Sequence, residues 1–96
     1  DEETHGKLGD LYMATNQADA ALQEYLVGLA LEPLDKATAN YRVASAYKAL
    51  DDRSQSMEYL MTALDIAPQY RPAQQLLLEM TREPAGETGD TNSTAN

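Results

Sequence analysis

Residues 8–33 read LGDLYMATNQADAALQEYLVGLALEP, and the chain repeats this stretch 35 positions later, over residues 43–68, as VASAYKALDDRSQSMEYLMTALDIAP. Small residues recur as small residues, large ones as large ones, and the proline as proline. The aligned positions are Leu8 with Val43, Gly9 with Ala44, Tyr12 with Tyr47, Ala21 with Ser56, Tyr25 with Leu60, Gly28 with Ala63, Leu29 with Leu64 and Pro33 with Pro68. Self-similarity at a fixed period of roughly 20 to 50 residues predicts a stack of similar units.

The spacing within each copy matches a helical repeat pattern. The first copy reads Leu8-Gly9-x2-Tyr12, Ala21-x3-Tyr25 and Pro33, and the second reads Val43-Ala44-x2-Tyr47, Ser56-x3-Leu60 and Pro68. On these residues the chain resembles the tetratricopeptide repeat (TPR) family over about residues 2–81. It departs from the family at His5 and Asn40, where Trp is usual, and in one extra residue around positions 34–36. The resemblance implies an all-α fold, with antiparallel helix pairs stacked in a short right-handed superhelix of five helices.

Apolar periodicity and turn residues give the expected element boundaries. The expected helices cover 3–15, 18–31, 36–50, 53–66 and 71–82. Asn16 and Asp51 lie at the two turns within the pairs, where a left-handed residue is needed. Asp35 is the expected N-cap of the third helix. Asp52 and Gln55 have the spacing of a capping box that opens the fourth.

The domain organisation follows from these boundaries. We expect one TPR-like helical domain over residues 1–82, with repeats at about 2–35 and 37–70 and a capping helix at about 71–82. Residues 83–96 read EPAGETGDTNSTAN and contain no large apolar side chain. Such a segment cannot bury enough surface to offset the entropy of ordering it, so we expect a disordered acidic tail.

Small residues in each copy predict where helices approach closely. Within the pairs we expect Gly9 to meet Ala21 and Ala44 to meet Ser56, and we expect the next pair to stack against Gly28 or Ala63.

The larger apolar residues predict the core. Leu8 and Tyr12 are expected to form the apolar stripe of the first helix, and Met57 and Met61 a core or inter-repeat stripe. The cluster Leu76, Leu77, Leu78 and Met80 cannot all face inward, so some apolar surface of the last helix is expected to be exposed.

Composition narrows the function classes. The net charge is -9, with seven Lys and Arg scattered singly, which argues against nucleic-acid binding and favours a basic partner. There is no cysteine, and no apolar run approaches the length of a membrane span. We therefore expect a soluble protein without membrane insertion; the compartment stays open, and both the bacterial cytoplasm and the periplasm are compatible. Because the chain begins at Asp1 without a Met, we expect it to be part of a larger protein or a processed product.

The residue pattern indicates no catalytic centre. His5 is the single histidine, and we expect it to have a structural role because no second His or Cys could share a metal with it. HExxH and Gly-rich phosphate-loop motifs are absent from the sequence. The pairs Glu2-Glu3 and Asp51-Asp52 are expected to be solvated caps. We accordingly expect no enzyme activity and no catalytic, metal-binding or cofactor-binding residues.

The family resemblance implies a concave groove lined mainly by the first helix of each pair. The positions it implies are Glu3, Gly6, Asp10, Met13 and Ala14 in the first copy and Thr38, Tyr41, Ser45, Lys48 and Ala49 in the second. Members that grip a terminal carboxylate use Lys and Asn at two of these positions, where this chain has Gly6 and Asp10, then Tyr41 and Ser45. This difference argues against a carboxylate clamp.

The candidates for partner contact are Asp10, Met13, Tyr41, Ser45 and Lys48. Tyr41 would supply a flat anchor, and Asp10 would favour a basic side chain of the partner.

Two functions from different classes remain open. The first is a protein–protein interaction module that binds a peptide or helical segment of a partner in its groove. The second is a structural spacer or oligomerisation element whose terminal helices stack on neighbouring domains or on another copy. For the second, residues 63–80 (ALDIAPQYRPAQQLLLEM) resemble, in composition only, the C-terminal TPR segments of bacterial multidomain peptidases and envelope proteins.

Overall fold

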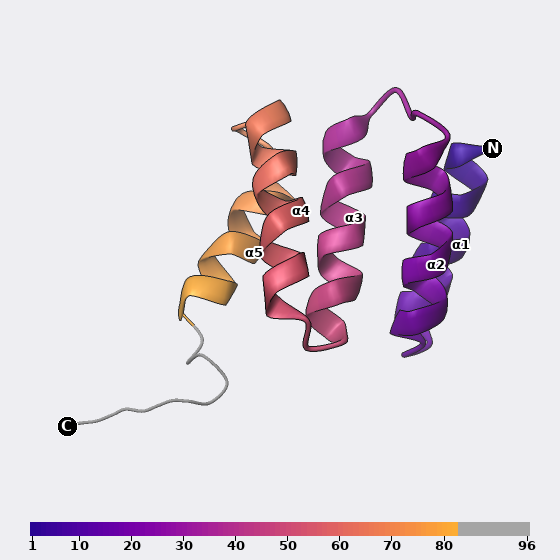
Figure 1. The fold of residues 1–96 in the computed structure, drawn as a ribbon, viewed down its shortest axis with the longest axis horizontal. Helices are drawn as coiled ribbons and strands as arrows, with labels where there is room; N and C mark the ends of the chain where they lie inside the picture. The colour runs from indigo at the N-terminus through magenta and orange to yellow at the C-terminus, as the bar shows by residue number, and fades with distance from the viewer. Residues whose placement is uncertain (83–96) are drawn as a thin grey trace.

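Five α-helices make up the computed structural model, which describes residues 1–82. They are α1 (Glu2–Ala14), α2 (Ala18–Ala30), α3 (Lys36–Ala49), α4 (Arg53–Ile66) and α5 (Arg71–Arg82). The helices follow one another across the molecule in chain order, with α1 and α2 at one end, α3 and α4 next, and α5 against α4 (Figure 1). Over these residues there is no strand, and the predicted all-α class of packed helix pairs is confirmed. The tail predicted for residues 83–96 lies outside the described residues.

The turns inside the two pairs are built alike. Asn16 and Asp51 both have the predicted left-handed backbone, with φ of 64° and 63°. In the second pair, the N–H of Asp52 donates to the carbonyl of Tyr47 across the end of α3 (2.9 Å), while the Asp52 carboxylate accepts from the N–H of Gln55 (3.2 Å). Only one of the two hydrogen bonds of the predicted capping box is therefore present. The other would need the N–H of Asp52, which already donates to Tyr47 at the end of α3.

The linker between the pairs sets how α3 starts. Glu32 precedes Pro33 and takes a left-handed φ of 56°, which ends α2, as expected when proline disfavours the helical region for the residue before it. Asp35 then caps α3 as predicted, accepting from the N–H of Thr38 (3.0 Å) and from its hydroxyl (2.7 Å). These two hydrogen bonds lower the pKa of Asp35, so the cap stays ionised well into the acid range.

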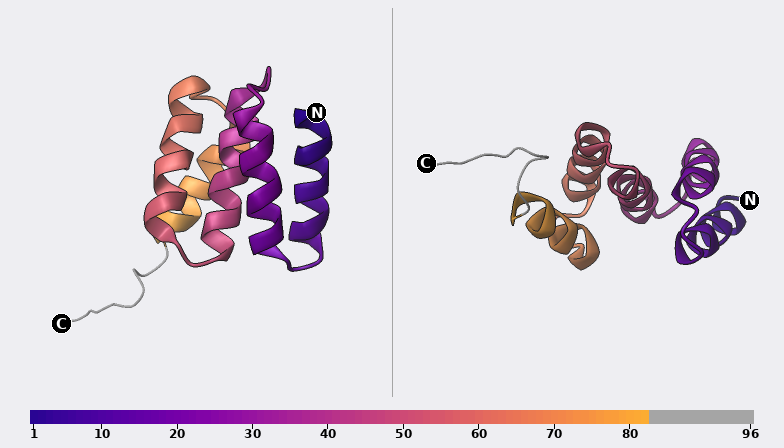
Figure 2. Two further views of the ribbon diagram at one scale, coloured as in Figure 1. Left: turned by 45° about the vertical axis from the view of Figure 1, so that its right-hand side comes forward. Right: turned by 90° about the horizontal axis from the view of Figure 1, so that it is seen from below.

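Two apolar clusters hold the stack together, one at each junction. The first joins α2 to α3 and contains Ala21, Leu22, Tyr25, Val43 and Ala46. The second joins α3, α4 and α5 and contains Ala44, Leu60, Ala63, Ala73, Leu76 and Met80. Seen end-on in Figure 2, the helices form a zigzag row. The inner helices α2, α3 and α4 each contact a neighbour on both sides.

The small residues of the second pair meet as predicted, whereas Gly28 of the first pair does not lie against the next pair. In the second pair, the Ser56 hydroxyl donates to the carbonyl of Ala44 at 2.7 Å, as the Ala44–Ser56 contact requires. In the first pair, Gly9 lies against the ring of Tyr25. Gly28 lies against α1 and not against the next pair, because the backbone of Glu2 covers it.

Some predicted core positions are exposed. Leu8 is 36 % exposed although its counterpart Val43 is fully buried, because Val43 packs in the cluster beneath α2 while no described helix precedes α1. Met57 packs on the second cluster, but Met61 is 49 % exposed, so the predicted methionine stripe is wrong at that position. On α5, Leu78 is exposed, as the Leu-rich sequence predicted.

Candidate binding groove

A cavity of about 360 Å³ opens on the face formed by α1 and α3 and is lined by most of the candidates for partner contact. Asp10 and Met13 enter it from α1, and Tyr41 and Ser45 from α3. The members of each set are three or four residues apart, which places them on one face of their helix. Lys48 is not among the residues that line this cavity, so four of the five candidates come together.

Tyr70, between α4 and α5, completes the cavity and was missed in the sequence reasoning. Its ring meets that of Tyr41 edge to face, with centroids 5.7 Å apart and planes at 84°. The Thr38 hydroxyl gives its proton to Asp35, so the Tyr70 hydroxyl donates to Oγ1 of Thr38 at 3.1 Å. The 35-residue period gives no signal for Tyr70, since Tyr70 lies one period after Asp35, which the pattern marks as a helix cap and not as a groove position. The two rings form an aromatic wall on one side of the cavity.

Asp10 is committed to partners within the chain. Its carboxylate accepts from the Tyr25 hydroxyl at 2.5 Å and from Nη2 of Arg42 at 2.9 Å. The Arg42 guanidinium lies over Gly6, where a Cβ would come within 2.5 Å of Nη1. The prediction that Asp10 draws a basic side chain therefore loses its physical basis, because the Arg42 charge already neutralises this carboxylate.

Burial of Tyr25, together with its hydrogen bond to the negative Asp10, raises the pKa of its phenol far above the ordinary value. The folded chain thus retains the proton at a pH where the unfolded chain loses it. The contribution of the protonated Tyr25 phenol to the stability of the fold is complete below the unfolded pKa of about 10 and is lost as the pH rises above this value.

We expect the free energy of unfolding to fall as the pH rises above about 10, and Tyr25→Phe to make this fall shallower. Urea denaturation followed by circular dichroism at several pH values measures both slopes. Tyr47→Phe is the control, because Tyr47 stacks on Tyr59 outside the cavity. Equal slopes in the chain and in Tyr25→Phe would contradict the assignment.

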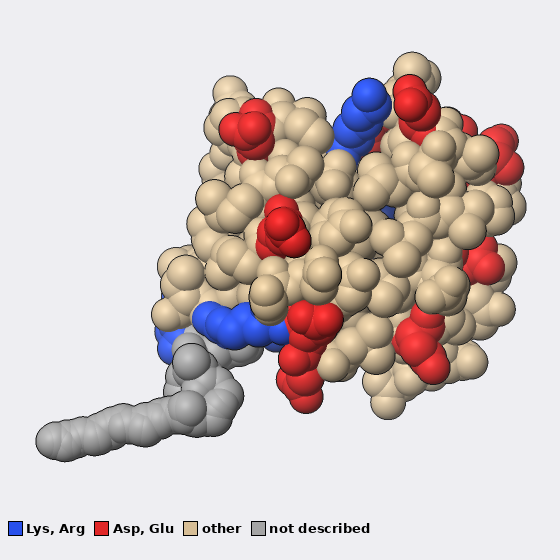
Figure 3. Space-filling view, viewed as in Figure 1, with Lys and Arg blue, Asp and Glu red and all other residues tan. Residues whose placement is uncertain are grey.

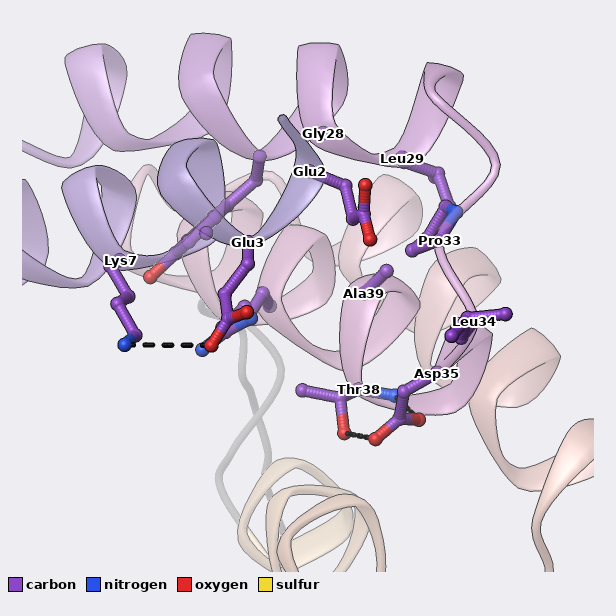
Figure 4. A pocket seen from close by; sticks show the side chains of 13 residues that line it. Glu2, Glu3, Lys7, Gly28, Leu29, Pro33, Leu34, Asp35, Thr38 and Ala39 are labelled. Atoms are coloured by element: carbon purple, nitrogen blue, oxygen red, sulfur yellow. Dashed lines mark hydrogen bonds and ion pairs between the residues drawn. The ribbon is translucent and has the colours of Figure 1, made fainter.

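A second cavity of about 360 Å³ adjoins the first (Figure 4). It lies between the start of α1, the end of α2, the α2–α3 linker and the start of α3. Tyr25, Thr38 and Arg42 line both cavities, so the two form one groove that the Asp10–Arg42 ion pair divides. The implied groove positions Glu3 and Gly6 belong to the second cavity, and Ala14 and Ala49 line neither.

The chemistry-bearing residues outside the groove have structural contacts. Nδ1 of His5 lies 2.7 Å from Oε1 of Glu24 and links α1 to α2, which agrees with the structural role expected for His5. Within residues 1–82, no group of three or more His, Asp or Glu side chains could hold a metal ion. Among the described helices, none has both the length and the apolar character to cross a membrane.

Comparison with known families agrees with this geometry. The tetratricopeptide repeat family model matches residues 37–70, which span α3, α4 and the linker to α5. No curated protein shows significant sequence similarity to the chain. The match and the five helices together fit a TPR-type helical repeat. Such repeats generally serve protein–protein interaction, and the family is typically non-enzymatic.

Proposed function

We propose that the chain is a protein–protein interaction module that binds a peptide or helical segment of a partner in the groove between α1 and α3. The observation that carries this proposal is the convergence of Asp10, Met13, Tyr41 and Ser45 on one cavity. Tyr41 and Tyr70 supply an aromatic wall, and the hydroxyl of Ser45 offers a hydrogen bond at its rim. Interfaces of this kind take most of their binding energy from aromatic anchors in pockets.

A variant that fills the cavity tests the proposal most cleanly. Asp10→Arg is unsuitable because it would break the bonds to Tyr25 and Arg42. Ser45→Lys instead places a long side chain in the cavity from a half-buried position on α3. Ser54→Lys on α4 is the matched control, since it makes the same change in charge at an exposed position outside both cavities.

The experiment is a screen of the chain and both variants against an array of blocked eight-residue peptides, with folding checked by circular dichroism. Binding that survives Ser54→Lys and falls at least about tenfold with Ser45→Lys, a loss of roughly 1.4 kcal/mol, supports the groove. Equal binding by both variants contradicts it.

One observation favours the alternative of a spacer or oligomerisation element. Leu8 and Leu11 of α1 are 36 % and 59 % exposed, whereas their counterparts Val43 and Ala46 are fully buried under α2. The uncovered face of α1 therefore has the apolar character of an inter-repeat junction. Sedimentation analysis of the chain beside Leu11→Glu tests this: self-association that the variant abolishes supports stacking, and a monomer at all concentrations opposes self-association.

A further inference from the structure

The second cavity has an apolar interior and an acidic rim. Leu29, Pro33 and Ala39 contribute apolar surface, and Leu34 at its edge is fully exposed. Glu2 and Glu3 approach from α1 on the opposite side (Figure 4). The exposed Leu34 side chain lies beside a cavity large enough for a side chain of a partner. Covering Leu34 would remove apolar surface from water, which is favourable.

The charges at this rim do not balance. Glu3 pairs with Lys7 at 3.4 Å, and Arg42 with Asp10 at 2.9 Å. Asp35 is ionised and hydrogen-bonded to Thr38. Among residues 1–82, Glu2 has neither a hydrogen bond nor an ion pair from its carboxylate, so the rim keeps unneutralised negative charge.

The chain as a whole has the same sign, with 16 Asp and Glu against seven Lys and Arg. On the face with α2 and α4 in front, Figure 3 shows acidic side chains spread over the surface and basic ones in only a few places. The net charge of -9 attracts cationic partners from a distance. A partner side chain that combines a long aliphatic stem with a positive end matches both the apolar interior and the acidic rim.

We propose that the second cavity is a subsite for an arginine or lysine side chain of the bound peptide, with an adjacent apolar residue of the peptide packed on Leu34. The inference rests on the proposed groove function and extends it. The cationic end lies beside Glu2 and Asp35, while the stem contacts Leu29 and Pro33. Selection for a basic partner thus comes from this end of the groove and not from Asp10.

The test is a positional-scanning array of acetylated, amidated eight-residue peptides. It is probed with the unmodified chain, with Glu2→Gln combined with Glu3→Gln, and with the control Glu58→Gln combined with Asp65→Asn. The control removes the same two charges from exposed positions on α4, outside both cavities. Circular dichroism confirms that all three remain helical.

We expect the chain and the α4 control to select a basic residue at one peptide position, and the α1 variant to lose that selection. For the best peptide, changing its arginine to the neutral isostere citrulline should weaken binding by about three- to tenfold, as the loss of one or two partly exposed ion pairs implies. This second measurement uses the unmodified protein, so it stands even if the α1 variant frays.

Four results would overturn the inference. Selection that persists in the α1 variant, or citrulline bound as well as arginine, rules out an acidic subsite while leaving the groove itself intact. Binding that is lost with Ser45→Lys but shows no preference for a basic peptide residue also rules out the acidic subsite and leaves the groove intact. If no peptide binds at all, both the groove function and the subsite fail.

Discussion

Gly9→Leu should lower the free energy of unfolding by about 1 to 3 kcal/mol, as overpacking a tight contact does. A Cβ at this position would lie only 2.5 Å from Cδ1 of Tyr25. Tyr25 is buried, and its hydroxyl is held by Asp10, so the ring cannot move aside without losing core contacts and that hydrogen bond. Urea denaturation followed by circular dichroism measures the loss.

Gly28→Ala is the matched control for this experiment, because Gly28 is also a buried helical glycine between α1 and α2. Its nearest neighbours would be the carbonyl oxygen of Glu2 at 3.3 Å and Cβ of His5 at 3.4 Å, a tight but tolerable fit. We expect its effect to stay within about 1 kcal/mol, since alanine also gains helix propensity over glycine. A Gly9 variant as stable as the unmodified chain would show that α1 and α2 are not held at this distance.

Leu60→Ala should have the largest effect on stability, a loss of about 2 to 5 kcal/mol. Leu60 is fully buried in the cluster that joins α3, α4 and α5, so its removal leaves a cavity in the contact between Ala44, Ala63 and Met80. For a helical domain of this size such a loss should lower the melting temperature by about 8 °C or more. Thermal unfolding followed at 222 nm gives the value.

The neighbouring Met61→Ala is the control, since Met61 follows Leu60 on α4 but is half exposed. We expect it to change stability by less than about 1 kcal/mol, because most surface substitutions have small effects. Similar losses for the two variants would mean that α5 does not pack on α4 as described.

The groove shows where sequence reasoning reached the site and where it did not. Period and family resemblance predicted that Asp10 and Tyr41 share one surface, because the helix repeat fixes which positions face the same side. The same reasoning treated Asp10 as free. Its engagement by Tyr25 and Arg42 depends on the distance between α1, α2 and α3, which no pattern along one helix encodes.

The sequence by itself determined the helices and their ends. Local chemistry suffices there: Asn16 and Asp51 tolerate the left-handed turn, Asp35 caps the helix that follows it, and a 35-residue period sets the order of the pairs. Only the tertiary structure decided which apolar residues are buried: Leu8 is exposed, whereas Val43 is covered. It also decided which charges are neutralised, because within residues 1–82 Asp10 has an ion-pair partner and Glu2 has none. Burial and charge pairing depend on what lies across the gap between helices, and that is set by packing of the whole chain.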